Sequence, residues 1–221
     1  KDIKVILFGG YKKPKGASSI NDYINYFSDP FSYFVSGISM DSSVITSSWK
    51  RRFPKFKDVK DAVIFNVGDE ELPPIDMCAG NCFLKDYYLD LVGKEIKNPM
   101  IVPEIFYKIV RSTGCFAMLK NSPTVHYSAD SVKKFFKKLD WRVKVNIHFK
   151  NIPGTGYSNR ESLQPKRASI KKYFFIPYAL TVVVPFLKSF YIFLKYKKPI
   201  FFIHPILSFY VAVLIIYYYL F

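Results

Sequence analysis

The residues of this sequence that are suited to chemistry are scattered along the chain and form no familiar catalytic motif. A serine nucleophile elbow, a phosphate-binding glycine loop, an HExxH helix and paired CxxC motifs are all absent, and Gly9-Gly10 is too short for a phosphate loop. The three cysteines, Cys78, Cys82 and Cys115, lack the second Cys or His pair that a zinc site needs. They indicate reduced thiols and a cytosolic face. His126, taken alone, is typical of a histidine satisfied within a strand.

A basic amphipathic helix is predicted from residue 132 onward, with Ser131 as its N-cap. Its apolar side chains recur at helical spacing, at Val132, Phe135, Phe136, Leu139 and Val143. Basic side chains fill most of the remaining positions, namely Lys133, Lys134, Lys137, Lys138, Arg142 and Lys144. Such a helix either lies in the lipid headgroup region or packs on the domain core with a solvated basic face. We favour the membrane surface, which suits Trp141.

Two long apolar stretches, 173–194 and 199–221, predict attachment to a membrane. The first contains Lys188 as its single charge, and the second is interrupted only by His204 and Ser208. Each is long enough to cross the hydrocarbon core, which takes about 20 apolar residues. We predict two transmembrane helices within 166–221, although a re-entrant hairpin also fits. Basic residues flank both stretches, so the charge pattern leaves the orientation open. His204 is expected to be an incidental polar residue between helices.

The chain carries a net charge of +16, from 33 Lys and Arg against 17 Asp and Glu. A surface this basic attracts nucleic acid, anionic lipid or a phosphorylated substrate. Many of the lysines border the apolar stretches, which favours lipid headgroups, and no nucleic acid is expected as a partner. Half of the residues are hydrophobic while the mean hydropathy is only +0.06, as expected for a water-facing domain joined to membrane helices.

Residues 1–130 alternate between strand and helix patterns, which predicts an α/β domain. Strands are expected at 1–8, 61–67, 116–119 and 124–127, and helices at 20–27, at 86–92 ending at Gly93, and at 103–113 ending at Gly114. Asp29-Pro30 is expected to end the first helix, and 35–45 to be extended around a turn at 41–43. The interfacial helix and its connector then occupy 131–165, followed by the helical hairpin at 166–221. An opening in mid-pattern at Lys1 suggests that an upstream part exists.

An ordered set of segments resembles the C-terminal half of family 2 glycosyltransferases, enzymes of the GT-A fold that often end in membrane helices. Met77–Lys85 (MCAGNCFLK) is similar to the family's Gly-Asn element before a short helix. Pro103-Glu104, a helix and Arg111–Gly114 (RSTG) resemble its acidic helix, and Asn121–Tyr127 (NSPTVHY) resembles the strand that carries Pro, Val and His. Asp140-Trp141-Arg142 stands where the family carries an aromatic and basic motif on an interfacial helix, and Asp29–Phe34 resembles a stretch of its membrane-bound members.

The resemblance implies the C-terminal part of a GT-A-like (Rossmann-like) domain and a membrane-bound enzyme. The enzyme would transfer a sugar from a nucleotide-sugar donor to a lipid-linked or glycan acceptor, with its catalytic domain on the cytoplasmic face. In such enzymes a divalent metal (Mg or Mn) held by Asp-x-Asp steadies the departing diphosphate. A carboxylate meanwhile deprotonates the acceptor.

Roles for particular residues follow from the same resemblance. Glu104 would be the base, although it equally fits a helix N-terminal acid stabilised by the dipole. Gly80 and Asn81 would border the acceptor pocket, and His126 would contact the diphosphate or the metal. Residues of the basic helix would face the membrane: Trp141 and Arg142 would close the site, with Arg142 contacting phosphate, and Lys133, Lys134, Lys137 and Lys138 would contact lipid.

The sequence also departs from the family. The nucleotide-binding first half and any Asp-x-Asp metal motif are missing from these residues, and the usual acidic pair is represented by Glu104 alone. We therefore expect this chain to be incomplete as an enzyme. The competing interpretation is a non-catalytic, membrane-anchored basic module that binds a partner protein or anionic lipid.

Overall fold

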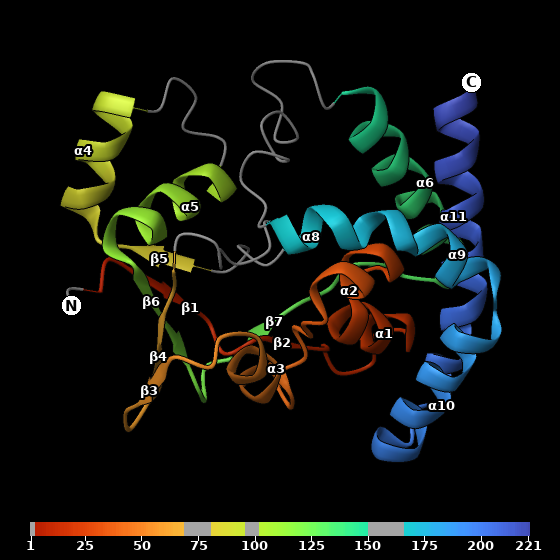
Figure 1. The fold of residues 1–221 in the computed structure, drawn as a ribbon. Helices are drawn as coiled ribbons and strands as arrows, with labels where there is room; N and C mark the ends of the chain where they lie inside the picture. The colour runs from red at the N-terminus through yellow and green to blue at the C-terminus, as the bar shows by residue number, and fades with distance from the viewer. Residues whose placement is uncertain (1–2, 69–80, 96–101, 150–165) are drawn as a thin grey trace.

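Short runs of β-branched and aromatic residues form a mixed sheet in the order β3-β4-β6-β1-β5. The strands are β1 (Val5–Leu7), β3 (Phe56–Asp58), β4 (Ala62–Asn66), β5 (Asn81–Phe83) and β6 (Cys115–Leu119). β1 runs parallel to β6, and every other neighbouring pair is antiparallel. The structure is a computed structural model that describes residues 3–68, 81–95, 102–149 and 166–221 (Figure 1). The α/β class predicted from the sequence is confirmed.

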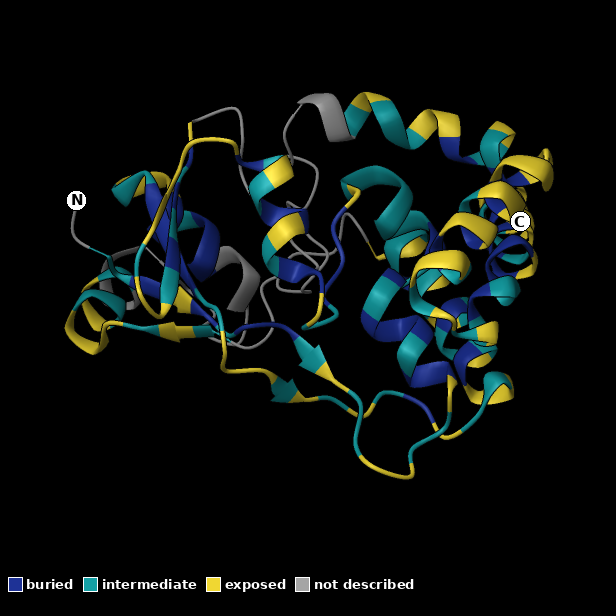
Figure 2. Cartoon of the chain, turned by 90° about the horizontal axis from the view of Figure 1, so that it is seen from below, coloured by how far each residue is buried: buried dark blue, intermediate teal, exposed yellow. Residues whose placement is uncertain are grey.

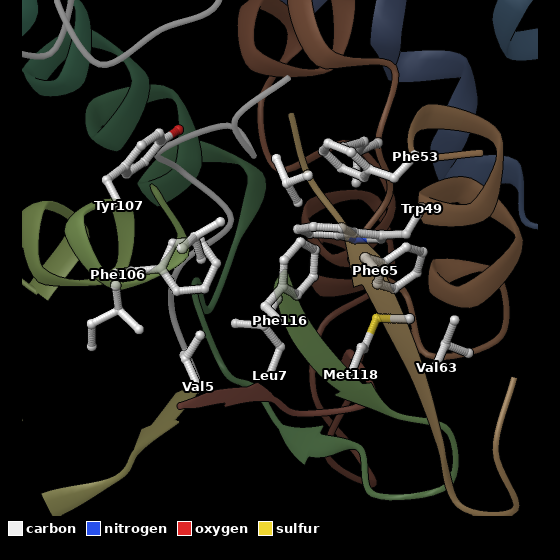
Figure 3. Close-up of a cluster of buried hydrophobic side chains, with 14 of the residues drawn as sticks. Val5, Leu7, Trp49, Phe53, Val63, Phe65, Phe106, Tyr107, Phe116 and Met118 are labelled. Carbon is white, nitrogen blue, oxygen red and sulfur yellow. The ribbon is translucent and has the colours of Figure 1, made fainter. Parts of the chain in front are cut away.

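One core lies on the face of this sheet that α3 (Ile45–Arg52) and α5 (Val102–Thr113) cover. β4 alternates between half-buried and buried positions, so Val63 and Phe65 point into this core. Trp49 of α3 meets them from the other side and is fully buried (Figure 3). Burying one large apolar side chain contributes about 1.5–3 kcal/mol. Aromatic packing on one sheet face therefore holds this half of the molecule together.

Local capping interactions set the ends of several helices, both beside the sheet and in the helical part of the molecule. α5 ends at Thr113 because Gly114 adopts a left-handed φ of 63°, as predicted. α1 (Ile20–Phe27) has the predicted bounds. Asp29-Pro30 does more than end it, because these residues start α2 (Pro30–Ser36): the Asp29 carboxylate accepts a hydrogen bond from the Ser32 amide at 2.8 Å.

A second core joins α1 and α2 to α6 (Val132–His148) and the C-terminal helices. The C-terminal elements are α8 (Lys166–Lys171), η2 (Lys172–Phe174), α9 (Phe175–Leu180), α10 (Val183–Tyr196), η3 (Pro199–Ile203) and α11 (His204–Leu220). Figure 1 shows these helices on the side of the molecule away from α4 (Lys85–Glu95) and the sheet. His204 is fully buried here, with hydrogen bonds to the Tyr23 hydroxyl at 2.8 Å and the Tyr178 hydroxyl at 3.1 Å. It lies between helices, as predicted, but it is not incidental, because its two hydrogen bonds connect α11 to α1 and to α9.

The first apolar stretch is broken into two helices, so the single transmembrane helix predicted for it is not confirmed. Ser169–Leu180 and Val183–Tyr196 meet at a bend of 91°. Pro185 gives the physical reason, because a proline ring inside a helix clashes with the carbonyl four residues earlier, here that of Thr181. Val182 accordingly takes a φ of 56°, which no helix continues through.

Pro199–Leu220 is the one helix among the described residues that is long and apolar enough to cross a membrane. It has 22 residues and a mean hydropathy of 2.2, and 39% of its most apolar window is buried within the protein. The bent pair would count as a second membrane span only if Ser169–Leu180 and Val183–Tyr196 crossed the membrane as one unit. The C-terminal region is thus apolar as predicted, with one straight candidate span rather than two.

The apolar face of α6 packs on protein, contrary to the prediction that it rests on lipid. Phe135 is fully buried and Leu139 is 1% exposed. Phe136 packs edge-on against Tyr210 of α11, with ring centroids 4.7 Å apart. The alternative of a helix packed on the core with a solvated basic face is the one that the structure shows. The amphipathic pattern of α6 fits burial against lipid and burial against protein equally well.

Smaller differences from the sequence predictions concern α4, the strand after residue 123 and the segment 35–45. α4 continues through Gly93, predicted to be its end, to Glu95. The strand expected at 124–127 is limited to β7 (Thr124–Val125), which pairs in parallel with β2 (Tyr11–Lys12). The extended segment expected at 35–45 is bounded by α2 and by α3, a helix that was not predicted because its sequence, ITSSWKRR, has few apolar positions.

Candidate functional site

A basic cluster forms where the β2–β7 pair, α1, α2 and α6 meet. We call it the His126 cluster and define it as Asn25, Asp29, His126, Lys138 and Arg142. Its members come from segments far apart in the sequence, and Figure 1 shows β7 leading from the sheet toward α1 and α6. The sequence predictions included His126 and Arg142 as site residues, and the structure brings these two together.

His126 is held from three directions. Its backbone amide donates to the Lys12 carbonyl at 2.9 Å, which extends the β2–β7 pairing by one residue. Its ring stacks on Tyr11 with centroids 4.2 Å apart, and Nδ1 lies 3.0 Å from Oδ1 of Asn25. An amide oxygen only accepts hydrogen bonds, so Nδ1 carries the proton. Nε2 is then the nitrogen that gains a proton when the ring becomes charged.

The segment that follows His126 is fixed to α1 by Asn21. The side-chain oxygen of this fully buried asparagine accepts hydrogen bonds from the amides of Ser128 at 2.8 Å and Ala129 at 3.2 Å. Its side-chain nitrogen donates to the Ala129 carbonyl at 2.8 Å. Three bonds from one buried side chain place the start of α6 relative to α1. The Ser131 hydroxyl then caps α6 by accepting from the Lys134 amide, as predicted.

Two basic side chains one helical turn apart on α6 complete the cluster. Lys138 Nζ donates to the Ser128 hydroxyl oxygen at 2.6 Å. Arg142 Nη1 lies 3.3 Å from Oδ2 of Asp29, the residue that caps α2. Residues spaced by four lie on one helix face, so both cations are directed at the loop between β7 and α6 and at α2. Lys138 therefore differs from the lipid contact that was predicted for it.

The electrostatics of the cluster favour an anion. Partial burial lowers the pKa of His126 below its ordinary value, and the charges of Lys138 and Arg142 lower it further. Burial also lowers the pKa of Lys138, with a further contribution from Arg142. Burial is the larger cause of both shifts; the smaller cause is repulsion among the cations, which a bound anion would relieve. A guanidinium fork, an ammonium and an imidazole suit phosphate or diphosphate oxygens.

The other predicted site residues lie apart from the cluster. Asn81 begins β5, where it pairs with Leu7 of β1. Glu104 lies in the first turn of α5, and its side chain is outside the described residues, as is Gly80. Figure 1 shows α5 and β5 on the opposite side of the view from α6. The structure thus does not join the predicted acceptor side and the predicted phosphate side into one described site.

The remaining residues of the basic helix face outward. Trp141 is 55% exposed, and Lys133, Lys134 and Lys137 are exposed as well. Lys134 forms an ion pair with Asp130 one turn earlier. Contact of these positions with a lipid surface stays a prediction.

Within the described ranges, no group of three or more His, Cys, Asp or Glu side chains gathers closely enough to hold a metal ion. The resemblance implies a divalent cation (Mg or Mn) held by an Asp-x-Asp motif, which this sequence lacks, so the cation stays a prediction.

Sequence reasoning missed Asn25, Asp29 and Ser128 as parts of the site. One signal was present: Asp29-Pro30, followed by Ser32, is typical of a helix start. No local pattern relates Asn25 or Ser128 to α6, because their contacts depend on how α1 packs. Comparisons of the chain with protein-family models, with curated proteins and with solved structures found no match.

Proposed function

We propose that this chain is the acceptor-side part of a membrane-bound glycosyltransferase that moves a sugar from a nucleotide-sugar donor to a lipid-linked or glycan acceptor. The observation that carries the proposal is the convergence of His126, Lys138 and Arg142 on one anion-favouring cluster. His126 and Arg142 belong to two separate segments that resemble the family's diphosphate-side motifs. A diphosphate leaving group is the anion that such a cluster would take.

The sheet supports the same proposal at the level of the fold. A parallel β1–β6 pair flanked by antiparallel strands is compatible with the C-terminal part of a GT-A-like domain. β5 begins at Asn81, the residue that the resemblance puts at the acceptor pocket. The helix that carries Glu104 packs on the same sheet.

The position of α6 supports a site next to a membrane. α6 carries two cations of the His126 cluster and packs along α11, which belongs to the candidate span Pro199–Leu220. Asp140 accepts a hydrogen bond from the Tyr218 hydroxyl at 2.9 Å, which fixes this arrangement near the end of α11. We propose that the protein is integral to the membrane, with the cluster near the cytoplasmic surface.

In the proposed reaction, an acceptor hydroxyl attacks the anomeric carbon and gives its proton to a carboxylate. The resemblance assigns that role to Glu104, although α5 lies apart from the His126 cluster (Figure 1). The bond from that carbon to the diphosphate breaks, and the diphosphate leaves with the bonding electrons. Arg142 and Lys138 stabilise the charge that develops on it, and His126 donates a hydrogen bond to it from Nε2 once the ring takes up a proton. General base catalysis of this kind contributes about 10²–10⁴-fold.

The proposal is tested with full-length protein in membranes and a panel of radiolabelled nucleotide sugars, scoring incorporation into lipid-extractable and glycan fractions. We expect one donor to label one fraction. Glu104→Gln should lower turnover at least about 100-fold without reducing membrane association. Asp61→Asn, which alters an exposed carboxylate on the β3–β4 turn, is the matched control and should behave as the native protein.

Native-like turnover in Glu104→Gln would remove Glu104 from the mechanism. No incorporation from any donor, by protein that is folded and membrane-bound, would favour the non-catalytic basic module instead. That alternative is supported by the net charge of +16, which by itself suffices for binding anionic lipid.

A further inference from the structure

A second basic site lies at the C-terminal end of α2, whose N-cap belongs to the His126 cluster, in a cavity of about 600 Å³. The cavity opens between the end of α3, the end of α2, and the bent pair of α9 and α10. Four cations line it: Arg51, Arg52, Lys171 and Lys188. Among its described lining residues there is no Asp or Glu. We call it the Arg51 pocket and define it by these four cations with Tyr33, Phe34 and Val184.

The two lysines of the pocket lie over aromatic rings. Lys188 Nζ is 5.5 Å from the centroid of Tyr33, and Lys171 Nζ is 5.1 Å from the centroid of Phe34. Ring faces attract cations, but a contact of this kind contributes only about 0.5–1 kcal/mol at an exposed site. The rings orient the ammonium groups. Like charges that share one cavity repel each other, and a bound anion would reverse that cost.

Helix geometry explains part of this pattern but not all of it. Arg51 and Arg52 occupy the last turn of α3, where cations interact favourably with the helix dipole. Lys171 ends α8, and Lys188 lies within α10, two turns from its C-terminus. The dipole of α3 gives no reason for Lys188 to face the same cavity. A shared anionic ligand accounts for Arg51 and Lys188 facing one cavity.

The rim of the pocket indicates what the anion is attached to. Val184 lines the cavity and is 48% exposed, and it lies one helical turn before Lys188 on the same face of α10. Exposed apolar side chains continue along this helix, at Val183, Phe186, Leu187, Phe190 and Leu194. Figure 2 shows exposed positions on the outward sides of the C-terminal helices. A ligand with a charged head and an apolar tail matches both features.

We propose that the Arg51 pocket binds the phosphate headgroup of an anionic membrane phospholipid, whose acyl chains lie along α10. Arginine forks and lysine ammonium groups are the donors that phosphate oxygens prefer. The binding places Lys188 at the depth of the lipid phosphates. The site is independent of the proposed sugar transfer.

The test is native mass spectrometry of the full chain in neutral detergent, after incubation with equal amounts of phosphatidylglycerol and phosphatidylcholine. We expect the native protein to retain one phosphatidylglycerol in preference to phosphatidylcholine. Arg51→Gln/Lys188→Gln should retain it at least fivefold less. Lys57→Gln/Lys60→Gln removes the same charge from exposed positions around β3 and should retain it as the native protein does.

A charge-preserving variant separates binding from folding. Arg51→Lys/Lys188→Arg should retain phosphatidylglycerol within about twofold of the native level. Equal losses in the pocket variant and in Lys57→Gln/Lys60→Gln would overturn the proposal in favour of unspecific attraction. So would equal retention of the two lipids. Displacement of the lipid by inorganic phosphate at the same concentration would assign the pocket to free phosphate.

Discussion

Arg142 of α6 and Asp29, the residue that caps α2, lie 3.3 Å apart and join two helices that are distant in the sequence. The same carboxylate accepts from the Ser32 amide at 2.8 Å and from the Ser32 hydroxyl at 2.9 Å. Asp29 therefore starts a helix and orients a guanidinium at once. The Arg142 guanidinium has five N–H donors, and its contact with Asp29 is made through Nη1.

Replacing this carboxylate should separate its two tasks. Asparagine is as good an N-cap as aspartate, so Asp29→Asn should preserve α2 while removing the negative charge from the His126 cluster. We expect binding of pyrophosphate to tighten severalfold, measured by isothermal titration of the full chain in detergent. Asp29→Ala should in addition lower the free energy of unfolding by about 1 kcal/mol, because the cap is lost. Weaker pyrophosphate binding in Asp29→Asn would contradict an anion site here.

The pH response of His126 follows from the lowered pKa of its ring, which burial and then Lys138 and Arg142 produce. The unfolded chain binds this proton more tightly than the folded one. The free energy of unfolding should therefore be fully maintained above the ordinary histidine pKa of about 6.5 and should fall as the pH drops below it. His126→Gln should flatten that slope, measured by denaturation at several pH values. Pyrophosphate should raise the pKa of the native ring in an NMR titration, and an unchanged pKa would argue against binding there.

Asp22 ties the connector between α10 and α11 to α1. Its carboxylate lies 2.6 Å from Lys13 Nζ and 2.8 Å from Lys198 Nζ. Burial alone would raise the pKa of Asp22, but hydrogen bonds from Lys13 and Lys198 outweigh it, and the net pKa is lowered. This contribution to stability should be present above the ordinary Asp pKa of 3.8 and be lost as the pH falls through the lowered value.

Removing that carboxylate should loosen the connector at neutral pH. We expect Asp22→Asn to increase the rate of tryptic cleavage after Lys195 and Lys197 severalfold, because two lysines lose their shared partner. Asp61→Asn should leave the cleavage rate unchanged. An unaltered rate in Asp22→Asn would show that the aromatic contacts of Tyr196 with Tyr26 and Phe201 suffice to hold the connector.

The packing of α6 on α11 makes a prediction that lipid contact would not. Leu139 is 1% exposed within the second core, so Leu139→Ala should lower the free energy of unfolding by about 2–5 kcal/mol in detergent. Trp141→Ala, at an exposed position two residues on, should change it by less than about 0.5 kcal/mol. If Leu139 faced lipid or detergent instead, the two variants would destabilise the protein to a similar, small extent.

Where local chemistry decides a structure, the sequence was sufficient to predict it. The bounds of α1, the Ser131 cap of α6 and the stop at Gly114 each depend on a few neighbouring residues. Features that depend on a packing partner were not predictable. The apolar stripe of α6 is satisfied by lipid or by α11, and its sequence does not distinguish them. Trp49 of α3 is buried against Phe116 of the sheet, so the sequence of α3 alone does not indicate this helix.

The candidate site shows the same division. His126 was predicted to contact the diphosphate or the metal and Arg142 to contact phosphate, and the structure places the two close enough to interact. Lys138 was grouped with the outward lysines because helical spacing alone does not reveal that Ser128 lies beneath it. The bend before α10 has a visible cause in Pro185, but proline is tolerated in membrane helices, so its presence did not require a break.

The most direct test of the central claim, sugar transfer with the His126 cluster binding the leaving diphosphate, is the turnover of Arg142→Lys in full-length protein in membranes. Lysine keeps the charge but not the bidentate fork, so turnover should fall by about 100-fold, with Leu139 packing and membrane association intact. Lys144→Gln, which removes an exposed charge from the same helix, is the control and should turn over as the native protein does. Native-like turnover in Arg142→Lys would contradict the account.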